Sequence, residues 1–277
     1  MIRRVLTATS AAAVAVALTA TSTGPLSASP GEQEGWYLAL GDSLAAGYQP
    51  GRGDSRTGGY AGRVLESVRA QSPRTRLVNM GCSGETTTTL IGGGTCRYEQ
   101  GSQLGAAAAF LEAHPTSTRL VTVDIGANNV TPCAGGGIDP ACVATRALTV
   151  RRELTGILAR LRRAAPDVHI VVLNYYDALL ATWLAGPGAA ALASGSVTQL
   201  DVLNAAIAES ASSAGARLAD VAAAFHTPTT VTVLLDGRAM PLNVALVCQW
   251  TWMCASGDIH ANDTGYAVIA SAVNAVR

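Results

Sequence analysis

The sequence predicts a single α/β domain of three layers, in which a central parallel sheet lies between two layers of helices. The 277 residues are 49% hydrophobic, which is enough apolar material for a sizeable core. Strand-like apolar runs alternate with segments of helical periodicity, which is typical of a parallel sheet covered on both faces. No internal repeat and no linker divides the sequence, so we expect one domain over residues 29–277.

The expected elements alternate strictly along the chain. Apolar runs predict strands at Trp36–Leu40, Arg76–Asn79, Arg119–Ile125, His169–Leu173 and Ala216–Ala219. Helical periodicity follows each of them at Tyr60–Gln71, Leu104–Ala113, Ala144–Ala165, Val197–Ser213 and Asn262–Val276. The fourth strand is almost entirely aliphatic, which fits a strand buried on both faces. Pro166 ends the third helix, and Asn262 is a natural N-cap for the last.

Residues 1–28 are typical of a secretory signal peptide rather than of the folded domain. The arginine pair at positions 3 and 4 precedes Val5–Ala20, an apolar run of small residues, and a Ser/Thr/Pro/Gly-rich stretch follows. We expect cleavage after Ala28, with Ala20 as a competing site and an uncleaved anchor as the alternative. The run is too short and too rich in threonine for a membrane span, and no other long apolar run predicts one.

The charge balance excludes a strongly basic binding protein. The chain has 19 basic and 19 acidic residues, and removal of the leader takes away two arginines, which leaves a net charge of −2. No basic stripe stands out, so nucleic acid is not an expected partner. Aromatic residues are 5% of the chain, which disfavours a platform for stacking bases or sugars.

Six cysteines support export. An even number in a secreted chain predicts a disulfide framework, for which six cysteines allow 15 connectivities. They fall into three local pairs, and we expect the bridges Cys82–Cys96, Cys133–Cys142 and Cys248–Cys254. A zinc site is the alternative, but no Cys-x-x-Cys pair or nearby histidine supports it. We expect neither a metal nor a cofactor.

Four turns carry side chains suited to acyl transfer, and the first three follow strands, whose carboxyl ends meet at one edge of a parallel sheet. Ser43, in Gly-Asp-Ser, begins a helix and is either a nucleophile or an N-cap. Gly84 can bring a backbone N–H close to an oxyanion, or is a plain turn. Asn128, in Gly-Ala-Asn-Asn, can donate from its amide or tolerate a left-handed turn. His260 stands just before the closing helix.

Together and in this order, the four blocks resemble those of the SGNH, or GDSL, hydrolase superfamily. The resemblance extends from Trp36 to the end of the chain. It implies a flavodoxin-like three-layer fold, Ser43 as the nucleophile and His260 as its base. It also implies an oxyanion hole made of the backbone N–H groups of Ser43 and Gly84 and the amide of Asn128. The cysteine layout and the leader are similar to those of secreted bacterial lipases and esterases of this superfamily.

The chain departs from the family pattern at two positions. The third block usually reads Gly-x-Asn-Asp, and here the last position is Asn129. The last block usually has an Asp three residues before the His, where this chain has Gly257. Asp258, two residues before His260, is therefore the expected third member of the triad, and a backbone carbonyl near Ser256 is the alternative.

Other polar residues fit structural roles better. We expect His114 to be solvated, His169 to be structural at the start of a buried strand, and His226 to lie in a loop. Asp124 either supports the site or is a buried hydrogen-bonding residue. An α/β-hydrolase nucleophile is excluded, because that fold uses Gly-x-Ser-x-Gly well inside the domain.

The resemblance implies a serine hydrolase that cleaves lipid or short-chain acyl esters, and we expect it to be a monomer. Removal of O-acetyl groups from carbohydrates is the second candidate function, and a non-catalytic secreted binding protein on the same scaffold is the third. The segment Tyr175–Ser196, which is aromatic and aliphatic and then rich in Gly and Ala, either walls an acyl pocket or packs into the core.

Overall fold

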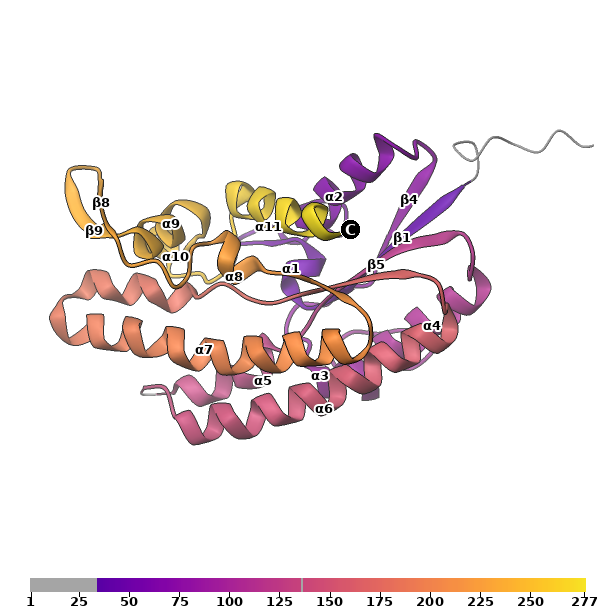
Figure 1. Cartoon of the computed structure of the whole chain (residues 1–277), viewed down its shortest axis with the longest axis horizontal. Helices are drawn as coiled ribbons and strands as arrows, with labels where there is room; N and C mark the ends of the chain where they lie inside the picture. The colour runs from indigo at the N-terminus through magenta and orange to yellow at the C-terminus, as the bar shows by residue number, and fades with distance from the viewer. Residues whose placement is uncertain (1–33, 136) are drawn as a thin grey trace, which may run out of the picture.

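The computed structural model describes residues 34–135 and 137–277, so the expected leader lies outside the described residues (Figure 1). At the centre is a five-stranded, all-parallel sheet, which confirms the predicted fold class. In spatial order its strands are β4 (Thr75–Asn79), β1 (Gly35–Gly41), β5 (Thr118–Asp124), β6 (His169–Leu173) and β7 (Arg217–Ala219). The strand order reverses between β1 and β5, and ligands of open parallel sheets bind outside the carboxyl ends of strands at such a point.

Helices cover both faces of the sheet. The pair α2 (Gly59–Arg69) and α11 (Asp263–Val276) packs together on one face, and α4 (Gln103–Ala113), α6 (Pro140–Ala164) and α7 (Pro187–Ser213) lie on the other (Figure 1). The inner strands are buried along most of their length, as expected for a sheet covered on two sides. This covered sheet is the rigid scaffold on which the strand-end turns are placed.

Short elements complete the chain around this scaffold. They are α1 (Ser43–Ala46), β2 (Tyr48–Gln49), β3 (Gly53–Asp54), α3 (Thr87–Gly92), α5 (Ala127–Val130), the 3₁₀ helices η1 (Thr131–Ala134) and η2 (Ala178–Ala185), α8 (Val221–Ala224), β8 (Thr232–Leu235), β9 (Arg238–Pro241), α9 (Leu242–Trp250) and α10 (Met253–Ser256).

Two helices begin earlier than the sequence predicts. Helix α6 starts at Pro140 rather than Ala144, because Asp139 caps it and proline is favourable in a first helical turn. Helix α7 starts at Pro187 rather than Val197. Its first half contains four alanines, which favour a helix, and two glycines and two serines, which weaken it. This half packs against η2, and that contact supports the helix despite the glycines.

The hairpin of β8 and β9, together with α9, is absent from the sequence prediction. Asp236 and Gly237 both have positive φ, as a type I′ hairpin turn requires, and an Asp-Gly pair between apolar runs is the local signal for it. This region forms a small apolar cluster beside the main core, comprising Leu180, Ala181, Met240, Val244, Ala245 and Val247.

All three expected disulfides are present, namely Cys82–Cys96, Cys133–Cys142 and Cys248–Cys254. Of the 15 possible connectivities, the structure therefore has the predicted one, in which each cysteine is bonded to its neighbour along the chain. In the part of the chain that the structure describes, no helix combines the length and the apolar character needed to cross a bilayer.

Candidate active site

The turn after β1 presents Ser43. Gly41 has φ of 139°, and a Cβ there would lie 2.0 Å from the carbonyl oxygen of Asp124, so this turn fits closely against the end of β5. Asp42 caps α1 by accepting a hydrogen bond from the backbone N–H of Leu44 at 3.0 Å. The N-cap alternative for Ser43 is therefore wrong. Ser43 is the first residue of α1, and its Oγ is left for another partner.

That partner is His260, which lies 217 residues further along the chain. The Nε2 atom of His260 lies 2.8 Å from Ser43 Oγ, and its Nδ1 atom lies 2.7 Å from Asp258 Oδ1. The ring of Tyr48 packs against the imidazole with 4.3 Å between centroids. The structure thus brings the three predicted residues into one hydrogen-bonded row in the order carboxylate, imidazole and hydroxyl.

A tight turn explains how Asp258 reaches the ring from only two residues away. Gly257, at φ of 72°, ends α10 in the left-handed conformation. Asp258 Oδ1 then accepts the backbone N–H of His260 at 2.9 Å as well as contacting Nδ1. The hydroxyl of Tyr176 donates to the carbonyl of Ile259 at 2.7 Å and holds the segment in place. The imidazole therefore contacts this carboxylate and not a carbonyl near Ser256.

The second and third sequence blocks meet beside Ser43. The side chain of Asn79 donates to the carbonyl of Ala45 at 2.6 Å, which fixes the start of the loop after β4 on α1. Gly84 follows in this loop with φ of 84°, a conformation that favours glycine. The amide of Asn128 donates to the carbonyl of Glu85, the next residue, at 2.9 Å. Its second N–H remains available for a ligand.

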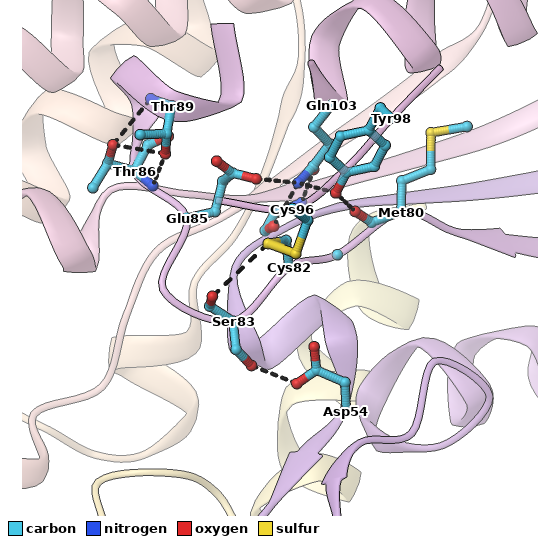
Figure 2. The surroundings of a disulfide bond; sticks show 12 residues. Asp54, Met80, Cys82, Ser83, Glu85, Thr86, Thr89, Cys96, Tyr98 and Gln103 are labelled. Atoms are coloured by element: carbon cyan, nitrogen blue, oxygen red, sulfur yellow. Dashed lines mark hydrogen bonds between the residues drawn. A yellow bond between two sulfur atoms is a disulfide. The ribbon is translucent and has the colours of Figure 1, made fainter. Parts of the chain in front are cut away.

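Figure 2 shows the contacts that fix the same loop around the Cys82–Cys96 bridge. The hydroxyl of Tyr98 donates to the carbonyl of Met80 at 2.6 Å, and Gln103 donates to Glu85 Oε2 at 3.2 Å. Gln103 also accepts from the N–H of Gly41 at 2.7 Å and donates to its carbonyl at 3.0 Å. One glutamine amide therefore links the Gly84 loop to the turn that carries Ser43. No sequence motif identified Gln103.

Two buried carboxyl groups lie beside the turn that carries Ser43. Asp42 Oδ2 accepts from the hydroxyl of Tyr175 at 2.7 Å, and Asp124 accepts from Tyr60 at 2.7 Å and from the N–H of Ala45 at 2.9 Å. Burial raises the pKa of Asp42. Burial, followed by the neighbouring charge of Asp42, raises the pKa of Asp124 well above its ordinary value. Asp124 is thus a buried residue whose two oxygens accept hydrogen bonds from Tyr60 and Ala45.

A cavity of about 230 Å³ opens beside Ser43, Asn128 and His260. Its apolar walls come from α5, η1 and α6 on one side and from η2 and α7 on the other, and they include Val130, Ile138, Val143, Leu179, Leu200 and Leu203. Both expectations for the segment from Tyr175 to Ser196 hold in part. Residues 175–179 line the cavity, whereas Leu180 packs in the apolar cluster of η2 and α9.

The other histidines lie outside this cavity. His114 packs against Trp36 and Phe110 and is half-buried, so the expectation that it is solvated is wrong. His169 lies 3.3 Å from the carbonyl of Val276 and joins β6 to the end of α11, and His226 is exposed in a loop. Within residues 34–135 and 137–277, no group of three or more His, Cys, Asp or Glu side chains is placed to hold a metal ion.

Comparison with known proteins agrees with this geometry. The family model described as "GDSL-like Lipase/Acylhydrolase family" matches residues 39–268, which contain the Ser43, Gly84, Asn128 and His260 blocks. The chain belongs to the GDSL-like lipase/acylhydrolase family. This GDSL-family chain is accordingly a carboxylic ester hydrolase. A comparison with curated proteins found no match.

Solved structures with the same fold include three hydrolases. The chain is 21% identical to an extracellular lipase from Streptomyces rimosus, with a TM-score of 0.53 over 88% of this chain and 100% of that one. It is 16% identical to the lipase Lip_vut3 from a goat rumen metagenome, with a TM-score of 0.51 over 87% and 96%. It is 20% identical to the α/β hydrolase LAE5 from the Lake Arreo metagenome, with a TM-score of 0.50 over 87% and 94%. At these identities the likeness concerns the fold.

Proposed function

We propose that this GDSL-family hydrolase is a secreted, monomeric serine esterase that cleaves esters of apolar acyl groups, with Ser43 as the nucleophile. The observation that carries the proposal is the 2.8 Å contact between Ser43 Oγ and His260 Nε2 at an apolar cavity. A serine hydroxyl is a weak nucleophile until a base within hydrogen-bond reach accepts its proton. His260 is within that reach.

The chemistry divides into two steps. His260 accepts the proton of Ser43 as Oγ attacks the ester carbonyl, and Asp258 stabilises the imidazolium that forms. The N–H groups of Ser43 and Gly84 and the free N–H of Asn128 donate to the oxyanion, and one such donor is typically worth ~2.7–4 kcal/mol. His260 then protonates the leaving alcohol, and water releases the acid from the acyl-enzyme by the same route.

The cavity supports an apolar acyl group as the part of the substrate that is recognised. Each methylene buried against its aliphatic walls is worth roughly 0.8 kcal/mol, or about a fourfold gain in kcat/KM. Activity should therefore rise with acyl length until the cavity is filled. An acetyl group would leave most of the cavity unfilled, which disfavours the carbohydrate O-acetyl esterase alternative.

A panel of p-nitrophenyl esters with acyl chains of increasing length, measured beside acetylated xylan, tests this proposal. We expect kcat/KM to rise over the first members, then level off, and to exceed the activity on acetylated xylan. The matched control is Ser43→Ala, which should neither hydrolyse any ester nor react with a fluorophosphonate probe. A wild-type protein that is folded but inert toward every ester and toward the probe would instead support the non-catalytic binding role.

Secretion is part of the same proposal. It is supported by the pattern of residues 1–28, by the three disulfides and by the Streptomyces rimosus neighbour, which is an extracellular lipase. Expression of the full chain in a secreting bacterial host should place the protein in the medium with a new N-terminus after Ala28. Retention in the cells with the leader intact would contradict it.

A further inference from the structure

Asn129 stands where the family usually has an aspartate, and the structure shows what it contacts. The residue is 4% exposed and lies on α5, directly after Asn128. Its side chain pairs twice with Thr87, the first residue of α3. The backbone N–H of Thr87 donates to Asn129 Oδ1 at 3.0 Å, and Asn129 Nδ2 lies 2.9 Å from Thr87 Oγ1.

The direction of each hydrogen bond follows from the donors available. A backbone N–H can only donate, so Oδ1 must face it and Nδ2 must face the hydroxyl, to which it donates. The hydroxyl of Thr87 has one hydrogen, which must then go to another acceptor. That acceptor is Glu153 Oε2, at 2.7 Å. Glu153 lies in α6, outside all four sequence blocks, and its side chain is 16% exposed.

We propose that Asn129 and Glu153 are a matched pair of positioning residues that act through Thr87 on the oxyanion side of the site. The inference rests on the proposed function for its catalytic consequence. An aspartate at position 129 would present acceptors to both groups of Thr87 and would take its hydroxyl hydrogen. Glu153 would then lose this donor, and two carboxylates would face one buried hydroxyl. The asparagine is therefore the residue that suits a chain with Glu153.

The pair bears on catalysis because it fixes the loop that carries Gly84. Asn128 holds this loop at the carbonyl of Glu85, and Asn129 holds it again at Thr87. Consecutive residues of one turn thus set the distance between the N–H of Gly84 and the amide of Asn128. Donors to an oxyanion must be in place before the reaction, so a small displacement of this loop should lower kcat more than it raises KM.

A double-mutant cycle tests the pairing. In Asn129→Asp we expect kcat for p-nitrophenyl butyrate to fall roughly tenfold or more, with KM within about twofold of the wild-type value. Glu153→Gln alone should lose less, because an amide oxygen still accepts from Thr87. Combining the two should restore most of kcat. The turned amide at position 153 can donate to Thr87 Oγ1, and the hydroxyl then donates to the carboxylate at position 129.

The matched control for the second substitution is Glu209→Gln, an exposed glutamate on α7 that pairs with Arg151. It should not restore the activity of Asn129→Asp. Full activity of Asn129→Asp, or a double variant no better than that single variant, would overturn the proposal. Thermal unfolding midpoints of the four proteins provide a second readout in which the same recovery is expected. The unfolding midpoints do not depend on activity. They therefore still test whether Asn129 and Glu153 are coupled if Asn129→Asp is too unstable to assay, or if the wild-type protein hydrolyses no ester and the proposed function fails.

Discussion

At the scale of single residues, the site depends on a few side chains that each make two hydrogen bonds. Asp258 Oδ1 contacts both the backbone N–H and the Nδ1 atom of His260, so one atom sets the turn and the orientation of the ring. Gln103 fixes the turn that carries Ser43 with both atoms of its amide, because Oε1 accepts from the N–H of Gly41 and Nε2 donates to its carbonyl. A substitution can therefore remove the charge of such a side chain while its hydrogen bonds are kept, which separates the effect of the charge from that of the geometry.

Replacing Asp258 by Asn separates them at the triad. An amide oxygen can keep both contacts to His260, but it cannot stabilise the imidazolium with a full negative charge. We expect kcat to fall by at least ~10²-fold, with little change in the unfolding midpoint. Steady-state hydrolysis of a p-nitrophenyl ester and a thermal melt measure the two effects. Activity within a few-fold of wild type would mean that Asp258 serves only the turn.

The sequence predicted the chemical groups of this site better than their supports. Ser43, Asn128 and His260 stand in recognisable blocks, and the structure brings them to one cavity. Asp42 was part of the first block, yet its role as the cap of α1 required the backbone conformation. Glu153 and Gln103 could not be predicted, because their partners are far away along the chain and a single sequence carries no sign of such contacts.

At the scale of elements, the alternation of strands and helices was predictable because each has its own hydrophobic period. The start of α7 was not, because glycines and serines interrupt its alanine-rich first half and its packing against η2 cannot be seen in the sequence. Asp177 joins these two helices. It accepts from the N–H of Leu179 at 2.9 Å and from the hydroxyl of Ser196 at 2.6 Å. Burial raises the pKa of Asp177 to about 6.

This raised pKa gives Asp177 a testable effect on stability. The folded state holds the proton more tightly than the unfolded state, so the stabilisation is complete below about pH 4 and is lost as the pH rises through about 6. In Asp177→Asn, an amide N–H can donate to Ser196, whose hydroxyl then donates to the carbonyl of Ala193. We compare the free energy of unfolding of the variant with that of wild type. This difference, variant minus wild type, should be about 2 kcal/mol larger at about pH 8 than at about pH 4.

Urea unfolding of both proteins at the two pH values measures that difference, and the comparison cancels the titration of all other groups. The matched control is Asp167→Asn, an exposed aspartate between α6 and β6, which should show no such dependence. An equal effect of Asp177→Asn at both pH values would mean that the pKa of Asp177 is the same in the folded and unfolded states, which would contradict this prediction.

At the scale of the whole molecule, the strand order explains why residues from separate turns meet. Ser43 follows β1 and Asn128 follows β5, and these neighbours flank the point where the strand order reverses. Strand-like runs alone did not predict this order, since five parallel strands can be arranged in many ways. What was expected beforehand was a flavodoxin-like three-layer fold, and this expectation came from the family resemblance carried by the four blocks.

Removing single disulfides measures how much each covalent link contributes to the stability of the whole fold. Cys82–Cys96 closes the longest of the three loops, and Cys82 is fully buried behind the Gly84 loop. Removing this bridge with Cys82→Ala and Cys96→Ala should cost ~3 kcal/mol of unfolding free energy and should also lower kcat. Removing Cys248–Cys254, the shortest loop, should cost less. Denaturant unfolding of the two double variants compares them, and equal midpoints with the native protein would contradict both expectations.

The separation of 217 residues between Ser43 and His260 has a consequence for how activity appears in time. An unfolded chain contains the hydroxyl and the imidazole but no catalyst, because the two groups come within reach only after β1 is enclosed in the sheet and α11 has docked beside α2. Contacts of such high sequence separation form late and slowly compared with single helices. Ester hydrolysis during refolding should therefore lag behind the recovery of helical signal. A newly made chain should therefore be inactive toward esters until its last helix is in place.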